Sequence, residues 1–172
     1  MTAVSPAHKI MLLGEIGVGK SSIVRRLVFD RFDGVYGPTI GVDVYNYDLE
    51  NPGGGRPRRL IVWDTDGNYG DAIFNHVYMR QASAALVVAD LSRPQTLETL
   101  QRLAETMLTH QPGRYCGLVL NKTDLLPTGA RAELPAWIGE RHLPVMSTSA
   151  ATGENVRRAF QDAAEAMARR GR

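Results

Sequence analysis

The stretch Gly14–Ser21, which reads GEIGVGKS, has the residue types and spacing needed to bind a phosphate group. It fits the pattern G-x-x-x-x-G-K-[ST], in which glycines let several backbone N–H groups approach one anion. Lys20 is expected to reach the β- and γ-phosphates of a nucleotide, and the Ser21 hydroxyl is expected to bind Mg²⁺. The alternative is a glycine-rich turn with an incidental lysine. The residues expected to contact the nucleotide here are Gly14, Glu15, Ile16, Gly17, Val18, Gly19, Lys20, Ser21 and Ser22.

The sequence on either side of this loop favours phosphate binding. Upstream, Ile10–Leu13 is a short apolar run typical of a buried strand, and downstream Ile23 and Leu27 recur at helical spacing. A strand that turns through glycines into a helix places the partial positive charge of the helix N-terminus beside the anion. The loop is therefore predicted to hold the phosphates of a nucleotide.

A second motif, Asp64–Gly67, fits D-x-x-G and follows another apolar run. Its aspartate can hold Mg²⁺, often through a water molecule, while the Gly67 N–H can approach the terminal phosphate. Thr39, in the turn-rich loop Gly37–Gly41, is a candidate second hydroxyl ligand. A strand-terminal aspartate and a turn threonine are the alternatives. The predicted Mg²⁺ ligands are Ser21, Thr39 and Asp64.

A third motif, Asn121–Asp124, fits N-K-x-D and points to the base. Asp124 can accept hydrogen bonds from the ring N–H and the exocyclic amine of guanine, which adenine does not offer. The Lys122 stem can lie along the base, and the Ala150 N–H can donate to the guanine carbonyl. A polar turn is the alternative. The residues expected around the base are Asn121, Lys122, Asp124, Leu125, Ser149, Ala150 and Ala151.

The elements that must position these motifs alternate between apolar strands and helices. Strands are predicted over His8–Leu13, Val42–Glu50, Leu60–Trp63, Ala84–Ala89, Gly117–Leu120 and Pro144–Met146. Helices are predicted from the phosphate loop to about Asp30, over Ala72–Gln81, from Pro94 to about His110, near Ala130–Glu140 and over about Glu154–Arg169. This order predicts an α/β fold with three layers. Helices cover both faces of a mostly parallel six-stranded sheet, and one antiparallel hairpin lies at its edge. Each motif begins as a strand ends, so the motifs should meet at the carboxyl edge of the sheet.

Length and composition narrow the class of protein. At 172 residues the chain suits one domain over 1–172, with 1–7 expected to be disordered. The net charge of +2, without a basic stripe, argues against a nucleic-acid polymer as partner. The single cysteine, Cys116, fits a buried structural thiol and a reducing, cytoplasmic location. No apolar run is long enough to span a membrane, and neither Thr2 nor the tail offers a lipidation motif, so no intrinsic membrane anchor is expected.

From about His8 to Arg169, the motif order resembles small GTPases of the Ras superfamily, and specifically the Rab branch. Thr39–Val44 (TIGVDV) and Trp63–Thr65 carry the Rab resemblance. It implies a P-loop GTPase fold and a monomeric switch that binds GTP or GDP with Mg²⁺. It also implies partners: effectors, a GTPase-activating protein and an exchange factor. The switch loops would be Phe32–Gly41 and about Asp64–Val77. Arginine outnumbers lysine, with only three lysines present, which points to a prokaryotic source.

Within the first switch, the resemblance assigns two aromatic residues to the nucleotide. Phe32 would pack edge-on against the base, and Tyr36 would close over the phosphates. Both could instead be ordinary packing aromatics. By the same resemblance, the residues expected to take part in catalysis are Lys20, Thr39, Gly67 and Asn68.

Three positions depart from the family pattern. Asn68 stands where the family carries the glutamine that orients the attacking water, and its side chain is one methylene shorter. Ile16 replaces a small residue and would crowd an arginine finger, while Asp66 replaces alanine and would either repel GTP or join the Mg²⁺ shell. These changes predict tight binding and slow hydrolysis. The alternatives are a GTP-binding scaffold without turnover and a P-loop ATPase or nucleotide kinase. The N-K-x-D motif and the lack of a lid insertion disfavour the second of these.

Overall fold

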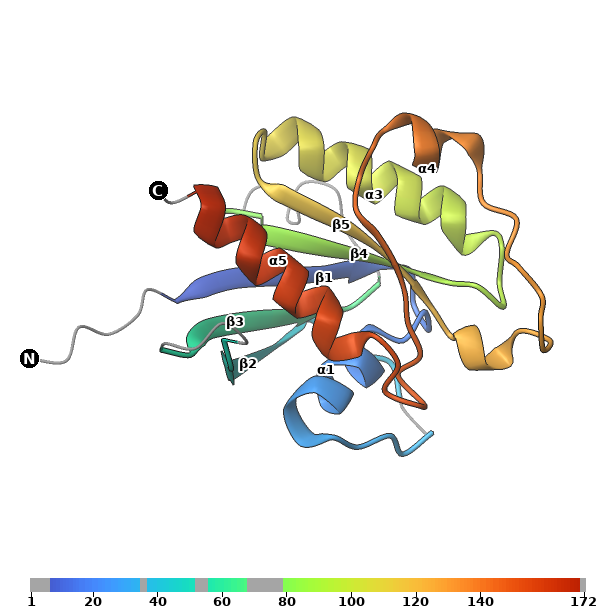
Figure 1. Ribbon diagram of the computed structural model, residues 1–172, viewed down its shortest axis with the longest axis horizontal. Coiled ribbons are helices and arrows are strands. Elements are labelled where there is room, and N and C mark those ends of the chain that lie inside the picture. Colours follow the sequence, from blue (N-terminus) through green and yellow to red (C-terminus); the bar gives the residue numbers. More distant parts are fainter. Residues whose placement is uncertain (1–6, 35–36, 52–55, 68–78, 171–172) are drawn as a thin grey trace, which may run out of the picture.

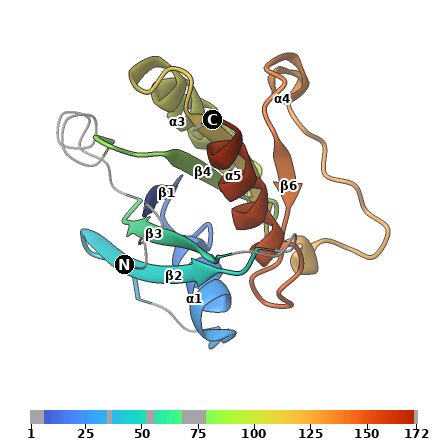
Figure 2. The same cartoon turned by 60° about the vertical axis from the view of Figure 1, so that its left-hand side comes forward.

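A computed structural model describes residues 7–34, 37–51, 56–67 and 79–170, and within them one sheet dominates. Its strands are β1 (His8–Gly14), β2 (Val42–Leu49), β3 (Arg58–Thr65), β4 (Ala84–Asp90), β5 (Tyr115–Asn121) and β6 (Val145–Ser147). They lie in the order β2-β3-β1-β4-β5-β6, so β2 and β6 form the two edges (Figure 2). Only β2 runs antiparallel to its neighbour β3. The carboxyl ends of the other five strands therefore meet at one edge, as predicted.

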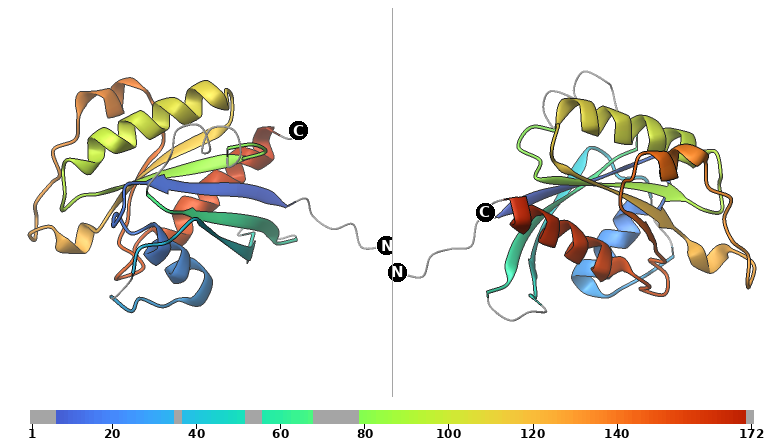
Figure 3. Two further views of the ribbon diagram at one scale, coloured as in Figure 1. Left: turned by 180° about the vertical axis from the view of Figure 1, so that it is seen from behind. Right: turned by 45° about the horizontal axis from the view of Figure 1, so that its top comes forward.

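Helices cover both faces of this sheet (Figures 1 and 3). The helices of the described residues are α1 (Lys20–Phe29), α3 (Thr96–His110), α4 (Ala136–Glu140), α5 (Val156–Arg170) and the short 3₁₀ helix η2 (Thr123–Leu125). In β1, Ile10 and Leu12 pack into the core under α1 and α5, whereas Met11 and Leu13 pack into the core under α3 and α4. Successive strand residues point to opposite faces, so a strand covered on both sides must be apolar throughout. No helix in the described ranges has both the length and the apolar character needed to cross a membrane.

Some predicted element bounds were wrong. The helix predicted near Ala130–Glu140 begins only at Ala136, after Pro135, because proline disfavours helical backbone at the residue before it. The helix predicted from Pro94 begins at Thr96. Residues 79–81, at the end of the helix predicted over Ala72–Gln81, form a bend and a turn, and 72–78 lie outside the described residues. The disorder predicted for 1–7 also falls almost wholly outside them.

Cys116 on β5 is buried, with 3% of its surface exposed, as the sequence predicted. Burial raises the pKa of its thiol to about 12. At pH 8, only about one thiol in ten thousand would therefore be the reactive thiolate. We expect no alkylation by iodoacetamide in the native protein and complete alkylation in guanidinium chloride, measured by mass spectrometry. Rapid alkylation under native conditions would show that this strand is accessible.

Candidate functional site

A cavity of about 670 Å³ opens at the carboxyl edge of the sheet. Its wall brings together residues from all three motifs and from the loop that follows β6. Of the residues predicted to bind nucleotide or metal, the wall contains Ile16, Gly17, Gly19, Lys20, Ser21, Ser22, Phe32, Thr39, Gly67, Asn121, Lys122, Asp124, Leu125, Ala150 and Ala151. Gly14, Glu15, Val18, Asp64 and Ser149 are not part of this lining. Tyr36 and Asn68 lie outside the described residues.

Lys20 is fixed at the centre of the phosphate loop. Its side chain is buried, and Nζ donates to the carbonyl oxygens of Gly14 at 2.8 Å and Glu15 at 3.0 Å. Burial lowers the pKa of Lys20 to about 8, although nearby carboxylates, first that of Asp64, act in the opposite direction. An anion in the cavity would favour the charged form further. The loop therefore holds a desolvated ammonium group ready for phosphate.

Ser21, Thr39 and Asp64 converge at the predicted metal position. Ser21 Oγ donates to Asp64 Oδ2 at 2.5 Å and lies 2.7 Å from Thr39 Oγ1. Asp64 is fully buried, and burial raises the pKa of its carboxyl to about 6, although the Ser21 hydrogen bond opposes this. Its Oδ1 is also buried and accepts no hydrogen bond from the described chain. A bare carboxylate oxygen beside two hydroxyls is a set of hard donors that fits Mg²⁺.

The base-side motif is tied to the phosphate loop. Asn121 Nδ2 donates to the Val18 carbonyl at 3.0 Å, and its Oδ1 accepts the Ala150 N–H at 3.2 Å. Ala150, which was predicted to donate to guanine, therefore donates to Asn121 in this structure. Asp124 Oδ1 accepts a hydrogen bond from Ser149 Oγ at 2.6 Å, which orients the carboxylate. These contacts join the two halves of the cavity wall into one unit.

The sequence model of the Ras family matches residues 9–169 of this chain. The chain belongs to the Ras family. It is 31% identical over 155 residues to Ras-related protein Rab-22A of Canis lupus familiaris, covering 88% of this chain and 79% of that protein. It is 33% identical over 159 residues to Ras-related protein Rab-31 of Rattus norvegicus, covering 89% of this chain and 79% of that protein. It is 34% identical over 160 residues to Ras-related protein Rab-36 of Mus musculus, covering 88% of this chain and 58% of that protein.

These matches confirm the predicted Rab-like identity and, with the strand order, the Ras-like P-loop fold. Proteins of the Ras family are small GTPases, which bind GTP or GDP with Mg²⁺ and act as switches. In general they interact with effectors, activating proteins and exchange factors. The family thus supports the predicted GTPase class.

Asp66, one of the three departures from the Ras family pattern, contacts the end of the first switch. Its Oδ2 accepts the Gly41 N–H at 3.0 Å, and its own N–H donates to the Gly41 carbonyl at 2.8 Å. The sequence offered only phosphate repulsion or Mg²⁺ binding for this carboxylate. The structure adds a third role, since Asp66 links the D-x-x-G motif to the segment that carries Thr39.

Sequence reasoning missed two charged residues beside the phosphate loop, Asp90 and Arg93. Asp90, at the carboxyl end of β4, accepts hydrogen bonds from Lys122 Nζ at 2.7 Å and Arg93 Nε at 3.0 Å. Arg93 Nη2 then donates to the Ile16 carbonyl at 2.9 Å. Burial opposes ionisation of Asp90, but hydrogen bonds from Lys122, Ser92 and Arg93 hold the pKa of Asp90 below the ordinary value. The place of Asp90 at a strand's carboxyl end was the available signal.

Proposed function

We propose that this chain is a guanine-nucleotide switch with slow, Mg²⁺-dependent GTP hydrolysis. The observation that supports this most is the single cavity, whose wall combines a phosphate loop, the Ser21 and Thr39 hydroxyls and a guanine-type base motif, with Asp64 hydrogen-bonded to Ser21 behind the wall. Lys20 would neutralise the β- and γ-phosphates, and Asp124 would read the guanine edge. Ser21, Thr39 and Asp64 would hold Mg²⁺, which supplies positive charge to the phosphate oxygens when bound.

Hydrolysis in this site would depend on positioning and electrostatics. Lys20 is already held by two carbonyl oxygens, so little reorganisation is needed when phosphate binds. Gly67 lies directly against the phosphate loop, since a Cβ there would be 2.2 Å from the Ile16 nitrogen. Its N–H would therefore approach the γ-phosphate, and Thr39 would close the first switch beside it.

Two residues support a slow rate. Asn68 keeps the amide that would orient water, but its reach is shorter by one methylene. Ile16 lines the cavity with 51% of its surface exposed, so its branched side chain occupies the approach that an arginine finger would use. An activating protein would then have to supply an amide or another group. The alternative is a scaffold that binds GTP without hydrolysing it.

Effector binding through the switch loops is part of the proposal. Ile40, beside Thr39, is 92% exposed, and Val44 at the start of β2 is 50% exposed. Exposed apolar side chains next to a nucleotide-sensing loop would let a partner detect the state of that loop. An activating protein and an exchange factor would act on the same region of a monomer.

Single-turnover hydrolysis of GTP with Mg²⁺ tests the catalytic proposal. We expect Asn68→Gln to quicken hydrolysis by roughly ten- to a hundredfold, because the amide regains its reach. Asn46→Gln, an exposed change on β2, is the matched control and should leave the rate unchanged. If the wild type and Asn68→Gln both bind GTP but form no GDP, the chain is a GTP-binding scaffold and not a switch. A wild-type rate equal to that of a glutamine-bearing relative would contradict the proposed slow rate, and ATP competing equally with GTP would contradict the base assignment.

A further inference from the structure

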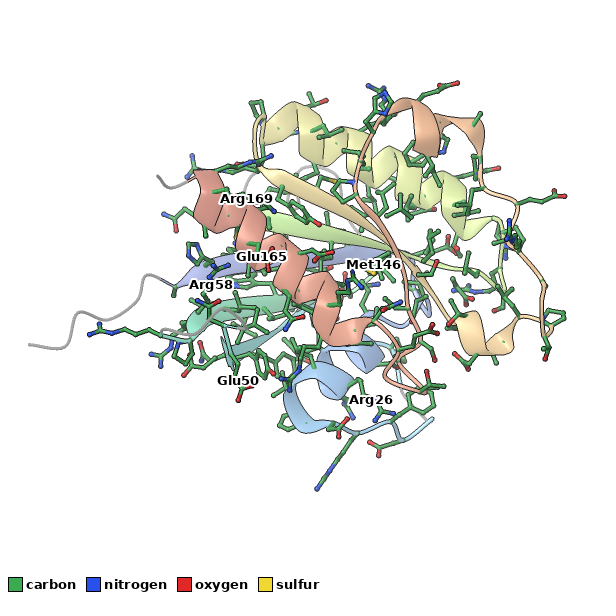
Figure 4. The ribbon with its side chains drawn as sticks, in the orientation of Figure 1. Arg26, Glu50, Arg58, Met146, Glu165 and Arg169 are labelled. Atoms are coloured by element: carbon green, nitrogen blue, oxygen red, sulfur yellow. The ribbon has the colours of Figure 1, made fainter. Side chains whose placement is uncertain are left out.

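Arg26 on α1 reaches out of its helix to the loop that follows β6 (Figure 4). Its Nε donates to the Ala150 carbonyl at 2.8 Å, and its Nη2 donates to the Ala151 carbonyl at 2.5 Å. Its Nη1 contacts Asp30 Oδ1 at 3.2 Å, one turn further along. The side chain is only 18% exposed. The planar guanidinium is thus held in one orientation and uses two edges at once, which a lysine could not do.

The two carbonyls belong to the base side of the cavity. Ala150 and Ala151 both line it, and the same loop is held from its other side by the base motif. There the Ala150 N–H donates to Asn121, and Ser149 Oγ donates to Asp124. The N-K-x-D motif and α1 therefore hold this loop from opposite sides.

The support from α1 also connects the two ends of the nucleotide site. This helix begins at Lys20 and Ser21, which serve the phosphate and metal positions, and Arg26 lies further along the same rigid element. The Gly153 backbone packs against the Arg26 stem, since a Cβ on that glycine would lie 3.5 Å from Arg26 Cδ. A single helix thereby fixes the distance between the phosphate end and the base loop.

We infer that Arg26 is a positioning residue that holds the Ala150–Ala151 loop against the base and so sets how long the nucleotide stays bound. The inference rests on the proposed guanine-nucleotide function. Without the guanidinium, the Ala150 and Ala151 carbonyls lose their charged donor, and the loop is no longer held from the α1 side. The bound nucleotide should therefore dissociate faster, whereas Lys20 and Ser21 at the phosphate end stay in place.

The test compares Arg26→Met, which keeps much of the stem, with Arg26→Lys and with Arg141→Met as control. Arg141 is exposed and pairs with Glu105 at 3.4 Å, away from the cavity. We expect a fluorescent GDP analogue to dissociate roughly ten- to a hundredfold faster from Arg26→Met, and at an intermediate rate from Arg26→Lys. Single-turnover hydrolysis of GTP already bound should change less than twofold in both variants.

Dissociation within twofold of the wild type in both Arg26 variants would overturn the inference. So would a parallel loss of hydrolysis and thermal stability, because Arg26 would then act on the whole fold. If Arg26→Met does not fold, the intermediate dissociation rate of Arg26→Lys carries the test. If the wild type does not bind the GDP analogue, the proposed function and this inference both fail. If the wild type binds the analogue and the Arg26 variants release it at the wild-type rate, only the inference fails.

Discussion

Replacing Gly19 with alanine is expected to abolish nucleotide binding, with a fall in affinity of at least a hundredfold. Gly19 precedes α1 with a φ of +102°, a conformation that costs an L-residue about 1–2 kcal/mol. Its Cβ would also lie 2.3 Å from Asn121 Nδ2. That amide must then move and lose its hydrogen bond to Val18. One methyl group would thus disturb the phosphate loop and the base motif together.

Gly129→Ala separates the effect of backbone strain from the effect of the clash with Asn121. Gly129 also has a positive φ, +77°, but no atom of the described residues lies within 4 Å of an added Cβ. This variant should lose roughly 1 kcal/mol of folding free energy from backbone strain and keep its nucleotide affinity. Titration with a fluorescent GDP analogue and denaturant unfolding measure both quantities. Equal nucleotide affinities for the two variants would show that the contact with Asn121 is unimportant.

The fold was largely predictable because buried parallel strands have a simple signature. Every residue of β4 and β5 is buried, so the apolar runs at Ala84–Ala89 and Gly117–Leu120 marked these strands to within a few residues. Helix starts were harder to predict. Whether a proline such as Pro135 opens a helix or interrupts one depends on how the chain packs around it, and local sequence does not contain that information.

The candidate site divides in the same way. Residues that act through a local motif, such as Lys20 and Asp124, could be predicted because the motif itself dictates their spacing. Arg26 and Arg93 act on backbone carbonyls of loops distant in sequence. Every residue type has a backbone carbonyl, so the sequence does not show which carbonyl will accept such a bond. Such contacts become visible only when the fold places α1 beside the loop after β6 and the turn between β4 and α3 beside the phosphate loop.

Replacing Asp124 with asparagine is expected to lower GTP affinity by roughly a thousandfold or more and to shift the preference toward xanthine nucleotides. A carboxylate can accept both the ring N–H and the exocyclic amine of guanine, whereas an amide presents an NH₂ donor to one of them. Two facing donors leave a buried polar group unpaired, and sites built on hydrogen bonds reject such mismatches strongly. Xanthine has a carbonyl in place of the amine, so the asparagine NH₂ would regain an acceptor.

Competition of GTP, XTP and ATP against a fluorescent nucleotide measures this change, with Asp48→Asn as control. Asp48 is an exposed carboxylate on β2 that pairs with Arg59 at 2.9 Å, so the control removes the same charge away from the cavity. Ser149 Oγ donates to Asp124 Oδ1 at 2.6 Å, and asparagine can still accept that bond through its carbonyl. The variant should therefore fold normally and present its NH₂ group toward the base. Unchanged GTP affinity in Asp124→Asn would mean that this carboxylate does not read the base, and the guanine assignment would fall with it.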